Sequence, residues 1–422
     1  MAEHKKGEFQ LIKIAVMGYG VVGSGTVEVF YKNHESIKEK VGEDIELKYI
    51  LDLRDFEDSP YKDKFVKDYN VILSDDEISV VAEVMGGLNP AYDYVKALLE
   101  AGKSVVTSNK ELVAEKGAEL LKIAREKNVN FFFEASVGGG IPIIRPLHHC
   151  LSANEVEEVA GILNGTTNFI LTKMISEKMP FDEALKMAQS LGYAERDPSA
   201  DVDGHDACRK ICILASLAFG KHVYPKNVHT EGIAGITPED VVYCNDFGGS
   251  VKLIGWASRR NGKAAVMVCP AFVSNKSQLS TVNDVFNAIL VRGNAVGDVM
   301  FYGRGAGKLP TASAVVADMI IAAKMKNNSR SLYWEDPESD SVVDYKTLEN
   351  KFYVRLICKD KGKALKEAES MWGKLQILHR EGELDNEAVF ITDKINEGKF
   401  EEDCAKLEDL AEIKGKIRVL DY

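Results

Sequence analysis

The feature that most constrains the fold is a glycine-rich turn between an apolar strand and a helix, close to the start of the chain. Residues 11–33 read LIKIAVMGYGVVGSGTVEVFYKN, in which an apolar, β-branched run passes through spaced glycines into a helical pattern. Gly18 permits a tight turn, Gly20 lets a pyrophosphate approach the backbone, and Gly23 lets the helix pack on the strand. The free N–H groups at the helix N-terminus then attract phosphate oxygens. The stretch predicts dinucleotide binding by Gly18, Gly20, Val21, Val22 and Gly23; a glycine-rich turn in another α/β fold is the alternative.

A second strand is predicted in IELKYILDLRDF, residues 45–56, and an acid near its end would bind the adenosine ribose. Asp52 is the candidate, but it comes 29 residues after Gly23, so we expect an insertion between them. Arg54 could instead bind a 2′-phosphate, or it could be an ordinary surface charge. The sequence therefore leaves NAD and NADP open, with a slight preference for NADP.

Strand and helix patterns continue to alternate as far as residue 140, which predicts a doubly wound parallel sheet of the Rossmann type. Ligands bind at the carboxyl ends of such strands. Thr107 and Lys110 directly follow a strand in the stretch TSNK, so we expect both at that ligand edge. A solvated surface lysine is the alternative for Lys110.

A glycine loop ends this region, in FFFEASVGGGIPIIRPL, residues 131–147. Glu134 ends an aromatic strand, and backbone carbonyls of a glycine loop beside one carboxylate can coordinate a hard cation. A simple turn near the cofactor is the interpretation that the residues favour. The stretch GILNGTTNFILTKM that follows is predicted as a strand, a polar turn and a helix start. Asn164, Thr166 and Thr167 suit a small polar substrate, and helix capping by a threonine is the alternative.

An acid-rich stretch before a lysine, GYAERDPSADVDGHDACRK at residues 192–210, holds the predicted chemistry. Asp206 and Lys210 are four residues apart and therefore neighbours on one helix face. The helix is otherwise apolar, which argues against an exposed surface pair, and Glu195 and Asp201 lie in the loop before it. Carboxylates around a lysine would hold its ammonium charged and oriented, able to protonate a carbonyl oxygen as a hydride arrives. The other carboxylates could bind a substrate amine or hydroxyl.

Composition excludes several classes of protein. The net charge of −12 argues against a nucleic-acid partner, and the longest apolar runs are too short to cross a membrane. The first ten residues lack the apolar segment of a signal peptide. Seven scattered cysteines without a CxxC pair fit reduced thiols in the cytoplasm, and Cys208 and Cys212 are better explained as small core residues than as metal ligands.

These motifs together resemble the homoserine dehydrogenase family. The resemblance covers roughly residues 12–325 and continues through EGIAGITPEDV and VNDVFNAILVRGNAVGDVMFYGRGAGKLPTASAVVAD. It implies NAD(P)-dependent interconversion of L-homoserine and L-aspartate 4-semialdehyde, on the pathway to threonine, methionine and isoleucine. The oxidising direction should gain at alkaline pH, where a neutral lysine accepts the hydroxyl proton. A dehydrogenase for another amino-acid aldehyde or alcohol, and a non-catalytic member that kept the fold, are the alternatives.

The resemblance also implies roles for individual residues. Lys210 matches the family's proton donor and acceptor, Asp206 its neighbouring acid, and Lys110 a second active-site lysine beside the nicotinamide. The resemblance implies substrate binding by Gly192 and Glu195, which join Asp201, Asp206 and Lys210 as the candidate substrate site. It implies cofactor binding by Gly305 and Gly307, in addition to the glycine turn, Arg54, Thr107 and Lys110. It also implies a sodium ion at Glu134, Val137, Gly139 and Ile141.

The C-terminal fifth is predicted as a separate module. Residues 326–349 are polar and acidic, as in a linker, and residues 350–422 show a strand–helix–strand–strand–helix–strand order that resembles the ACT domain, which senses threonine in many bacterial members. The turn after its first strand reads DKGKAL where such domains usually have proline and glycine, so a role as a dimer contact by edge-strand pairing stays open. We expect an NAD(P)-binding domain at residues 1–150 that is completed by about 295–325, then an α+β catalytic and dimerisation domain at 151–294, and then this module. The protein is expected to form a homodimer or homotetramer.

Overall fold

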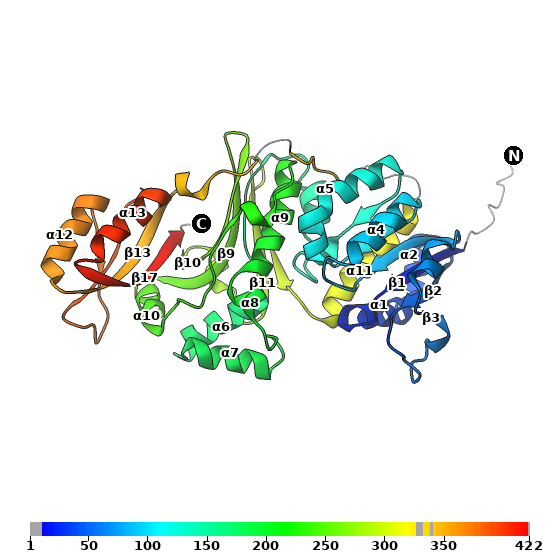
Figure 1. Ribbon diagram of the computed structural model, residues 1–422, viewed down its shortest axis with the longest axis horizontal. Helices are drawn as coiled ribbons and strands as arrows, with labels where there is room; N and C mark the ends of the chain where they lie inside the picture. Colours follow the sequence, from blue (N-terminus) through cyan, green and yellow to red (C-terminus); the bar gives the residue numbers. More distant parts are fainter. Residues whose placement is uncertain (1–10, 326–331, 338–340, 421–422) are drawn as a thin grey trace. The chain divides into compact units, whose positions relative to one another are not determined.

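The computed structural model describes residues 11–325, 332–337 and 341–420, and these fall into two compact units (Figure 1). The first unit comprises Met1–Ala153, Ser216–His222 and Ala306–Glu338. The second comprises Asn154–Ala215, Val223–Gly305 and Ser339–Tyr422.

The first unit is built on the predicted parallel sheet, with strand order β3-β2-β1-β4-β5-β6. From β1 the sheet grows toward one edge through β2 and β3, and from β4 it grows toward the other edge through β5 and β6. Because each crossover is right-handed, the helices of the two halves lie on opposite faces of the sheet. Accordingly α1, α2 and α11 contact one another, and α4 contacts α3 and α5. The strands are β1 Ile12–Met17, β2 Ile45–Leu51, β3 Phe65–Val66, β4 Ile78–Glu83, β5 Ser104–Thr107 and β6 Phe131–Phe132; the helices are α1 Val21–Lys32, α2 His34–Val41, α3 Tyr69–Leu73, α4 Ala91–Glu100, α5 Lys110–Glu126 and α11 Lys308–Lys324.

Helix α2 is the insertion that the spacing between Gly23 and Asp52 predicts. It follows α1 after Asn33 and ends at Gly42, whose φ of 82° terminates the helix in the left-handed region. Ile37 and Val41 are its buried residues, so one apolar edge packs inward while its charged residues face solvent.

The chain returns to the first unit at Ala306, later than the predicted position near residue 295. Strand β12, Gly297–Arg304, pairs with β11, Phe286–Gly293, from end to end, and the two strands therefore belong to the sheet of the second unit. After the return, α11 packs on α1: a Cβ added at Gly25 would lie 2.8 Å from the carbonyl oxygen of Lys308.

The second unit is built on a mixed sheet with strand order β12-β11-β7-β9-β10-β17-β13-β15-β14. Strands β9 and β10 form a long antiparallel hairpin, closed by Asn261 and Gly262 with positive φ of 50° and 77°, as a twisted two-residue turn requires. The remaining elements before the C-terminal module are β7 Val156–Ile162, β8 His229–Thr230, β9 Gly249–Arg260, β10 Lys263–Ser274, α6 Gly165–Ser176, α7 Phe181–Ser190, α8 Ser199–Val202, α9 His205–Phe219 and α10 Pro238–Asp246. Short turn helices lie at Lys62–Lys64, Glu134–Ser136, Pro146–Cys150, Pro225–Asn227, Gln278–Thr281 and Tyr345–Thr347.

The C-terminal module has the predicted order of strands and helices apart from an added two-residue strand, β16, and its sheet is continuous with that of the second unit. Strand β17 pairs in parallel with β10, and Ala271 opposes Arg418. One edge of the module is therefore already used within the chain, which is why the module clusters with the second unit. Its elements are β13 Glu349–Cys358, α12 Lys361–Trp372, β14 Gln376–Leu378, β15 Glu387–Ile391, β16 Ile395–Asn396, α13 Glu397–Leu407 and β17 Ala411–Leu420.

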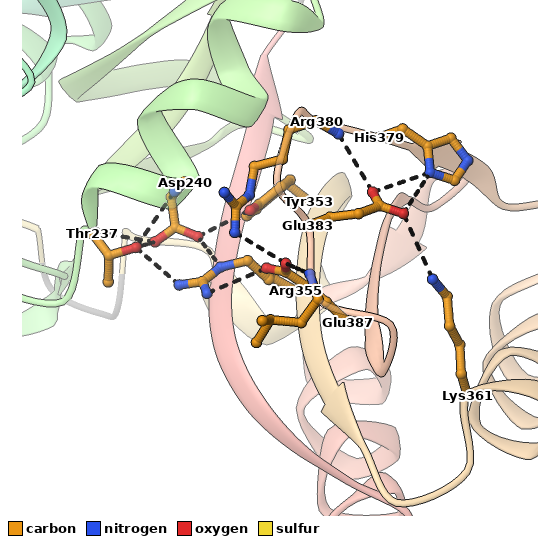
Figure 2. Close-up of polar contacts among 10 residues, drawn as sticks. Thr237, Asp240, Tyr353, Arg355, Lys361, His379, Arg380, Glu383 and Glu387 are labelled. Atoms are coloured by element: carbon orange, nitrogen blue, oxygen red, sulfur yellow. Dashed lines mark hydrogen bonds and ion pairs between the residues drawn. The ribbon is translucent and has the colours of Figure 1, made fainter.

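One buried ion pair and two hydrogen bonds join the module to α10 and its cap (Figure 2). Arg355 on β13 contacts Asp240 on α10 with Nε to Oδ1 at 2.8 Å, and donates through Nη2 to the hydroxyl of Thr237 at 2.9 Å. The hydroxyl of Tyr353 donates to the same Asp240 oxygen at 2.9 Å. Asp240 is fully buried, and such a charge is tolerated only when it is paired and hydrogen-bonded.

Replacing Arg355 by methionine should destabilise the second unit by about 3–5 kcal/mol, because removing one partner leaves the buried Asp240 charge without its cation. Urea denaturation of the whole chain measures this. Lys363→Met is the matched control, because Lys363 forms an exposed ion pair with Asp360 in the same module and should change the midpoint little. Equal midpoints for Arg355→Met and wild type would contradict a stabilising role for this contact.

The described part of the predicted linker is anchored to folded structure. Trp334 is buried and donates through its indole N–H to Nδ1 of His222 at 2.8 Å. Val342 forms a β-bridge with Ala264 on β10. The remaining residues of this stretch, 326–331 and 338–340, lie outside the described residues.

No helix in the described ranges is both long and apolar enough to cross a membrane. All seven cysteines are free thiols, and the pair predicted to be core residues, Cys208 and Cys212, is buried.

Candidate functional site

The glycine turn between β1 and α1 has the geometry that a pyrophosphate requires. Gly18 has a φ of 97°, in the region that favours glycine, and a Cβ at Gly23 would lie 1.9 Å from the Gly18 carbonyl oxygen. Gly20 is the N-cap of α1 and provides no side-chain cap, so the first N–H groups of the helix stay available to an anion. A Cβ at Gly20 meets nothing within 4 Å, which leaves open space above this backbone. The turn therefore fits a dinucleotide.

Asp52 lies directly after β2 and orders the same turn. Its carboxylate accepts the backbone N–H of Tyr19 at 2.8 Å and a two-point contact from Arg54, with Nε at 3.0 Å and Nη2 at 2.9 Å. The Arg54 guanidinium holds the pKa of Asp52 down at about 2. The Arg54 side chain is 63 % exposed, so its outer face can still meet a ligand.

Thr107 and Lys110 lie at the carboxyl end of β5, as predicted. Thr107 is buried, and its hydroxyl donates to Glu83 Oε2 at 2.5 Å. Lys110 is half-buried and is the first residue of α5. Both residues belong to the first unit, together with the glycine turn.

Lys210 and Asp206 form a buried pair in the second unit. Lys210 Nζ donates to Asp206 Oδ2 at 2.7 Å and to the backbone carbonyl of Leu163 at 2.7 Å. Lys210 is 7 % exposed and Asp206 3 %, which excludes the surface-pair interpretation. These two oxygens fix the direction of the Lys210 ammonium.

Asn164 joins the acids around this lysine. Its amide nitrogen donates to Asp201 at 2.6 Å and to Asp206 Oδ2 at 2.8 Å, while its Oδ1 caps α6 by accepting the N–H of Thr167 at 2.8 Å. The structure thus brings Asp201 into the cluster through Asn164, and the cap of α6 is Asn164 rather than the threonine that the capping interpretation named.

Gly192 and Glu195 lie on the exposed loop that leads to this cluster. Gly192 has a φ of 75° after α7, and the backbone carbonyl of Tyr193 accepts the Thr166 hydroxyl at 2.7 Å, which ties the loop to the start of α6. The Glu195 side chain is exposed. Its backbone carbonyl accepts the amide of Gln189 at 3.0 Å.

The glycine loop after β6 is a turn held by Glu134. Its buried carboxylate accepts the N–H groups of Ile143, Ile144 and Arg145 at 2.6–3.0 Å. Arg145 also contacts Glu134 and Asp318, each at 3.1 Å, so two carboxylates face one guanidinium. Burial raises the pKa of Asp318 to about 7. The described residues contain no group of three or more His, Cys, Asp or Glu that could hold a metal, so a cation here would depend on backbone carbonyls, for which the candidates are Val137, Gly139 and Ile141.

Gly305 and Gly307 mark the return of the chain. A Cβ at Gly305 would lie 2.0 Å from the side-chain nitrogen of the buried Asn287, so only glycine fits there. Gly307, with a φ of 122°, is the N-cap of α11 and adds no side-chain cap. Gly305 is the last residue of the second unit, and Gly307 belongs to the first.

Sequence reasoning missed several polar residues of these sites. Glu83 at the end of β4 is fully buried, and an acid inside the apolar run VVAEVMGG was the available sign. Asp318 is likewise an acid in an otherwise apolar helix. The partners Arg145 and Leu163 gave no comparable sign.

A chain that holds a dinucleotide on one unit and fixes an ammonium beside a carboxylate in the other has the parts for hydride transfer coupled to proton transfer. The class that this defines is the NAD(P)-dependent oxidoreductases.

Comparison with known proteins specifies the family. A family model described as "Homoserine dehydrogenase" matches residues 142–320, and one described as "Homoserine dehydrogenase, NAD binding domain" matches residues 18–134. The chain is 44 % identical over 321 residues to the homoserine dehydrogenase of Bacillus subtilis (strain 168), covering 75 % of this chain and 73 % of the relative. It is 38 % identical to that of Synechocystis over 97 % of this chain and 99 % of the relative. The chain therefore belongs to the homoserine dehydrogenase family.

Solved structures agree with this assignment along the whole chain. A crystal structure of a homoserine dehydrogenase from Thiobacillus denitrificans is 34 % identical, with a TM-score of 0.90 over 97 % of this chain and 98 % of that one. A hyperthermophilic archaeal homoserine dehydrogenase mutant in complex with NADPH is 30 % identical, with a TM-score of 0.63 over 74 % of this chain and 97 % of that one. The predicted Rossmann-type sheet with a mixed α/β second unit and the predicted enzyme class are confirmed.

Proposed function

We propose that Lys210 exchanges the proton when this enzyme interconverts L-homoserine and L-aspartate 4-semialdehyde. The observation that carries the proposal is the buried Lys210–Asp206 contact at 2.7 Å, with a second oxygen, that of Leu163, on the same ammonium. In oxidation a neutral Lys210 takes the hydroxyl proton as the carbon loses a hydride; in reduction the ammonium gives a proton to the aldehyde oxygen. The nicotinamide cofactor, when bound, supplies or accepts that hydride.

The neighbouring residues have proposed supporting roles. Asp206 orients the ammonium directly, and Asp201 supports it through Asn164. Glu195 and Gly192 would bind the amino-acid end of the substrate from their exposed loop, and Lys110 would act beside the nicotinamide. The direct test is spectrophotometric: homoserine oxidation at the nicotinamide absorbance, with NAD and with NADP.

We propose NADP as the preferred cofactor, bound at its 2′-phosphate by Arg54. Arg54→Ala should raise KM for NADP about 10- to 100-fold and leave KM for NAD nearly unchanged, because a charge-assisted contact to phosphate contributes about 1.5–3 kcal/mol. Steady-state kinetics with both cofactors measures this. Lys67→Ala is the matched control, since Lys67 forms an exposed ion pair with Asp55 nearby. Equal increases for the two cofactors would contradict the assignment.

We propose a sodium ion at the Glu134 loop. Two carboxylates there face one guanidinium, and burial together with the Glu134 charge raises the pKa of Asp318 to about 7, so a nearby cation would stabilise the ionised form of Asp318. Gly138 and Gly139, with φ of 72° and 53°, turn the backbone beside Glu134. Thermal unfolding in sodium chloride against tetramethylammonium chloride at equal ionic strength tests it: a higher midpoint in sodium supports a bound ion, and equal midpoints reject one.

We infer that the C-terminal module is chiefly architectural in an ACT-like fold. Pairing of β17 with β10 and the Arg355–Asp240 contact support this role. The turn after β13 is occupied by Asp360, whose carboxylate caps α12 at Lys363 N with 3.1 Å. If the module senses threonine, excess L-threonine should inhibit the enzyme.

We also propose that the chain forms a homodimer or homotetramer, which a mass measurement in solution would show as two or four times the chain mass. A cytoplasmic location is supported by the free thiols.

A further inference from the structure

Glu83 is a buried carboxylate at the ligand edge of the first unit that the dinucleotide fingerprint does not include. It is the last residue of β4 and is fully buried. Its Oε1 accepts the N–H of Met85 at 2.8 Å and of Gly86 at 3.4 Å, and its Oε2 accepts the Thr107 hydroxyl at 2.5 Å. A carboxylate out of water costs free energy unless it is hydrogen-bonded in this way, and burial raises its pKa.

From Thr107 the hydrogen bonds continue to the start of α5. The Thr107 oxygen accepts the N–H of Asn109 at 2.9 Å. Asn109 is the N-cap of α5: its Oδ1 accepts the N–H of Leu112 at 3.1 Å, and its Nδ2 donates to the carbonyl of Gly87 at 2.6 Å. The loops that follow β4 and β5 are thus joined at the carboxyl ends of adjacent strands, where ligands of such sheets bind.

Lys110 is the residue that follows the cap. Since Asn109 fixes where α5 begins, it also fixes where the Lys110 backbone lies and in which direction its side chain leaves the helix. The loop after β4 also lies beside the cofactor turn, because a Cβ at Gly18 would lie 3.1 Å from Met85. One carboxylate therefore holds both the lysine-bearing helix and a wall of the dinucleotide turn.

We propose that Glu83 is a positioning residue for Lys110, acting through Thr107 and Asn109. The proposal rests on the proposed active-site role of Lys110. A carboxylate is needed at this position because it only accepts: Oε1 faces backbone donors while Oε2 faces a hydroxyl whose oxygen already accepts from Asn109.

Glutamine at position 83 cannot reproduce this pattern. With its NH2 group toward Thr107, the hydroxyl loses its acceptor; with the NH2 group toward Met85 and Gly86, donors face donors. Glu83→Gln should therefore shift the start of α5 and lower kcat for homoserine oxidation by about 10- to 100-fold, the scale of a misplacement near 1 Å. Thr107→Val should lower kcat to a similar extent. Thr107→Ser keeps the hydroxyl, so its kcat should be about tenfold higher than that of Thr107→Val.

The deciding experiment is a double-mutant cycle on the full chain with Glu83→Gln, Lys110→Ala and the combination, measuring kcat and the thermal midpoint. If Glu83 acts through Lys110, the double variant has the same kcat as Lys110→Ala, to within about twofold. Glu77→Gln is the control for loss of a carboxylate, because Glu77 makes exposed ion pairs with Lys13 and Lys48 just before the same strand.

The outcomes separate the two levels of inference. Wild-type kcat for Lys110→Ala would reject the active-site role of Lys110 itself. A normal kcat for Glu83→Gln would reject positioning by Glu83. So would a double variant in which the two losses of kcat multiply while Lys110→Ala alone is impaired. Either result would leave the role of Lys110 intact. If Thr107→Ser lost as much kcat as Thr107→Val, the Thr107 hydroxyl would not connect Glu83 to Asn109 in the way proposed.

Discussion

Lys210→Met should lower kcat for homoserine oxidation and for semialdehyde reduction by about 10²- to 10⁴-fold, the contribution of a positioned general acid or base. Methionine fills nearly the same space but has no proton to exchange. The glycine turn lies in the first unit, so cofactor affinity should change little. Stopped-flow kinetics gives the chemical step, and quenching of intrinsic fluorescence by NADPH gives the affinity.

The controls separate chemistry from folding. Lys173→Met removes a lysine that pairs with Glu177 at i,i+4 spacing on the surface of α6, and should retain wild-type turnover. Asp206→Ala should impair kcat more than Asp201→Ala, because Asp206 contacts the ammonium directly and Asp201 acts through Asn164. A loss below tenfold for Lys210→Met in a folded protein would remove Lys210 from the proton transfer.

Local patterns predicted what local geometry determines. The glycine spacing predicted the β1–α1 turn, because the positive φ of Gly18 and the close approach of Gly23 to the Gly18 carbonyl are requirements within a few residues. The four-residue separation of Asp206 and Lys210 predicted their contact, because one helical turn brings them together. The doubly wound parallel sheet, though not its strand order, was predicted from the alternation of strands and helices, because right-handed crossovers allow few arrangements.

Contacts between distant parts of the chain could not be predicted in this way. The Glu83–Thr107 bond joins adjacent strands through side chains whose directions depend on the assembled sheet. Asp318 meets Glu134 only after the chain has returned to the first unit. Parallel pairing of β10 with β17 leaves no local pattern, so the C-terminal module was predicted to be separate. The hairpin of β9 and β10 was predictable in principle, since Asn-Gly between apolar runs is a strong turn pattern.

Gly23→Ala should lower both the stability of the first unit and its affinity for the dinucleotide. The added methyl would overlap the Gly18 carbonyl at 1.9 Å, and backbone atoms there cannot move without displacing the turn or α1. Overpacking of this kind costs about 1–3 kcal/mol or more, and the displaced N–H groups would weaken NADPH binding by at least about tenfold. Thermal unfolding without cofactor and titration with NADPH measure the two effects.

Gly20→Ala is the informative partner of that variant. Its methyl would enter open space, and its φ of −75° with a ψ of −154° lies just past the extended region open to alanine, so the free protein should lose little stability. The same methyl stands where a pyrophosphate approaches the backbone, so NADPH affinity should fall about tenfold. One glycine would thus be required by the fold and the other by the ligand. Normal NADPH affinity in Gly20→Ala would mean that the cofactor lies away from this turn, and normal unfolding of Gly23→Ala would mean that α1 can shift freely against β1.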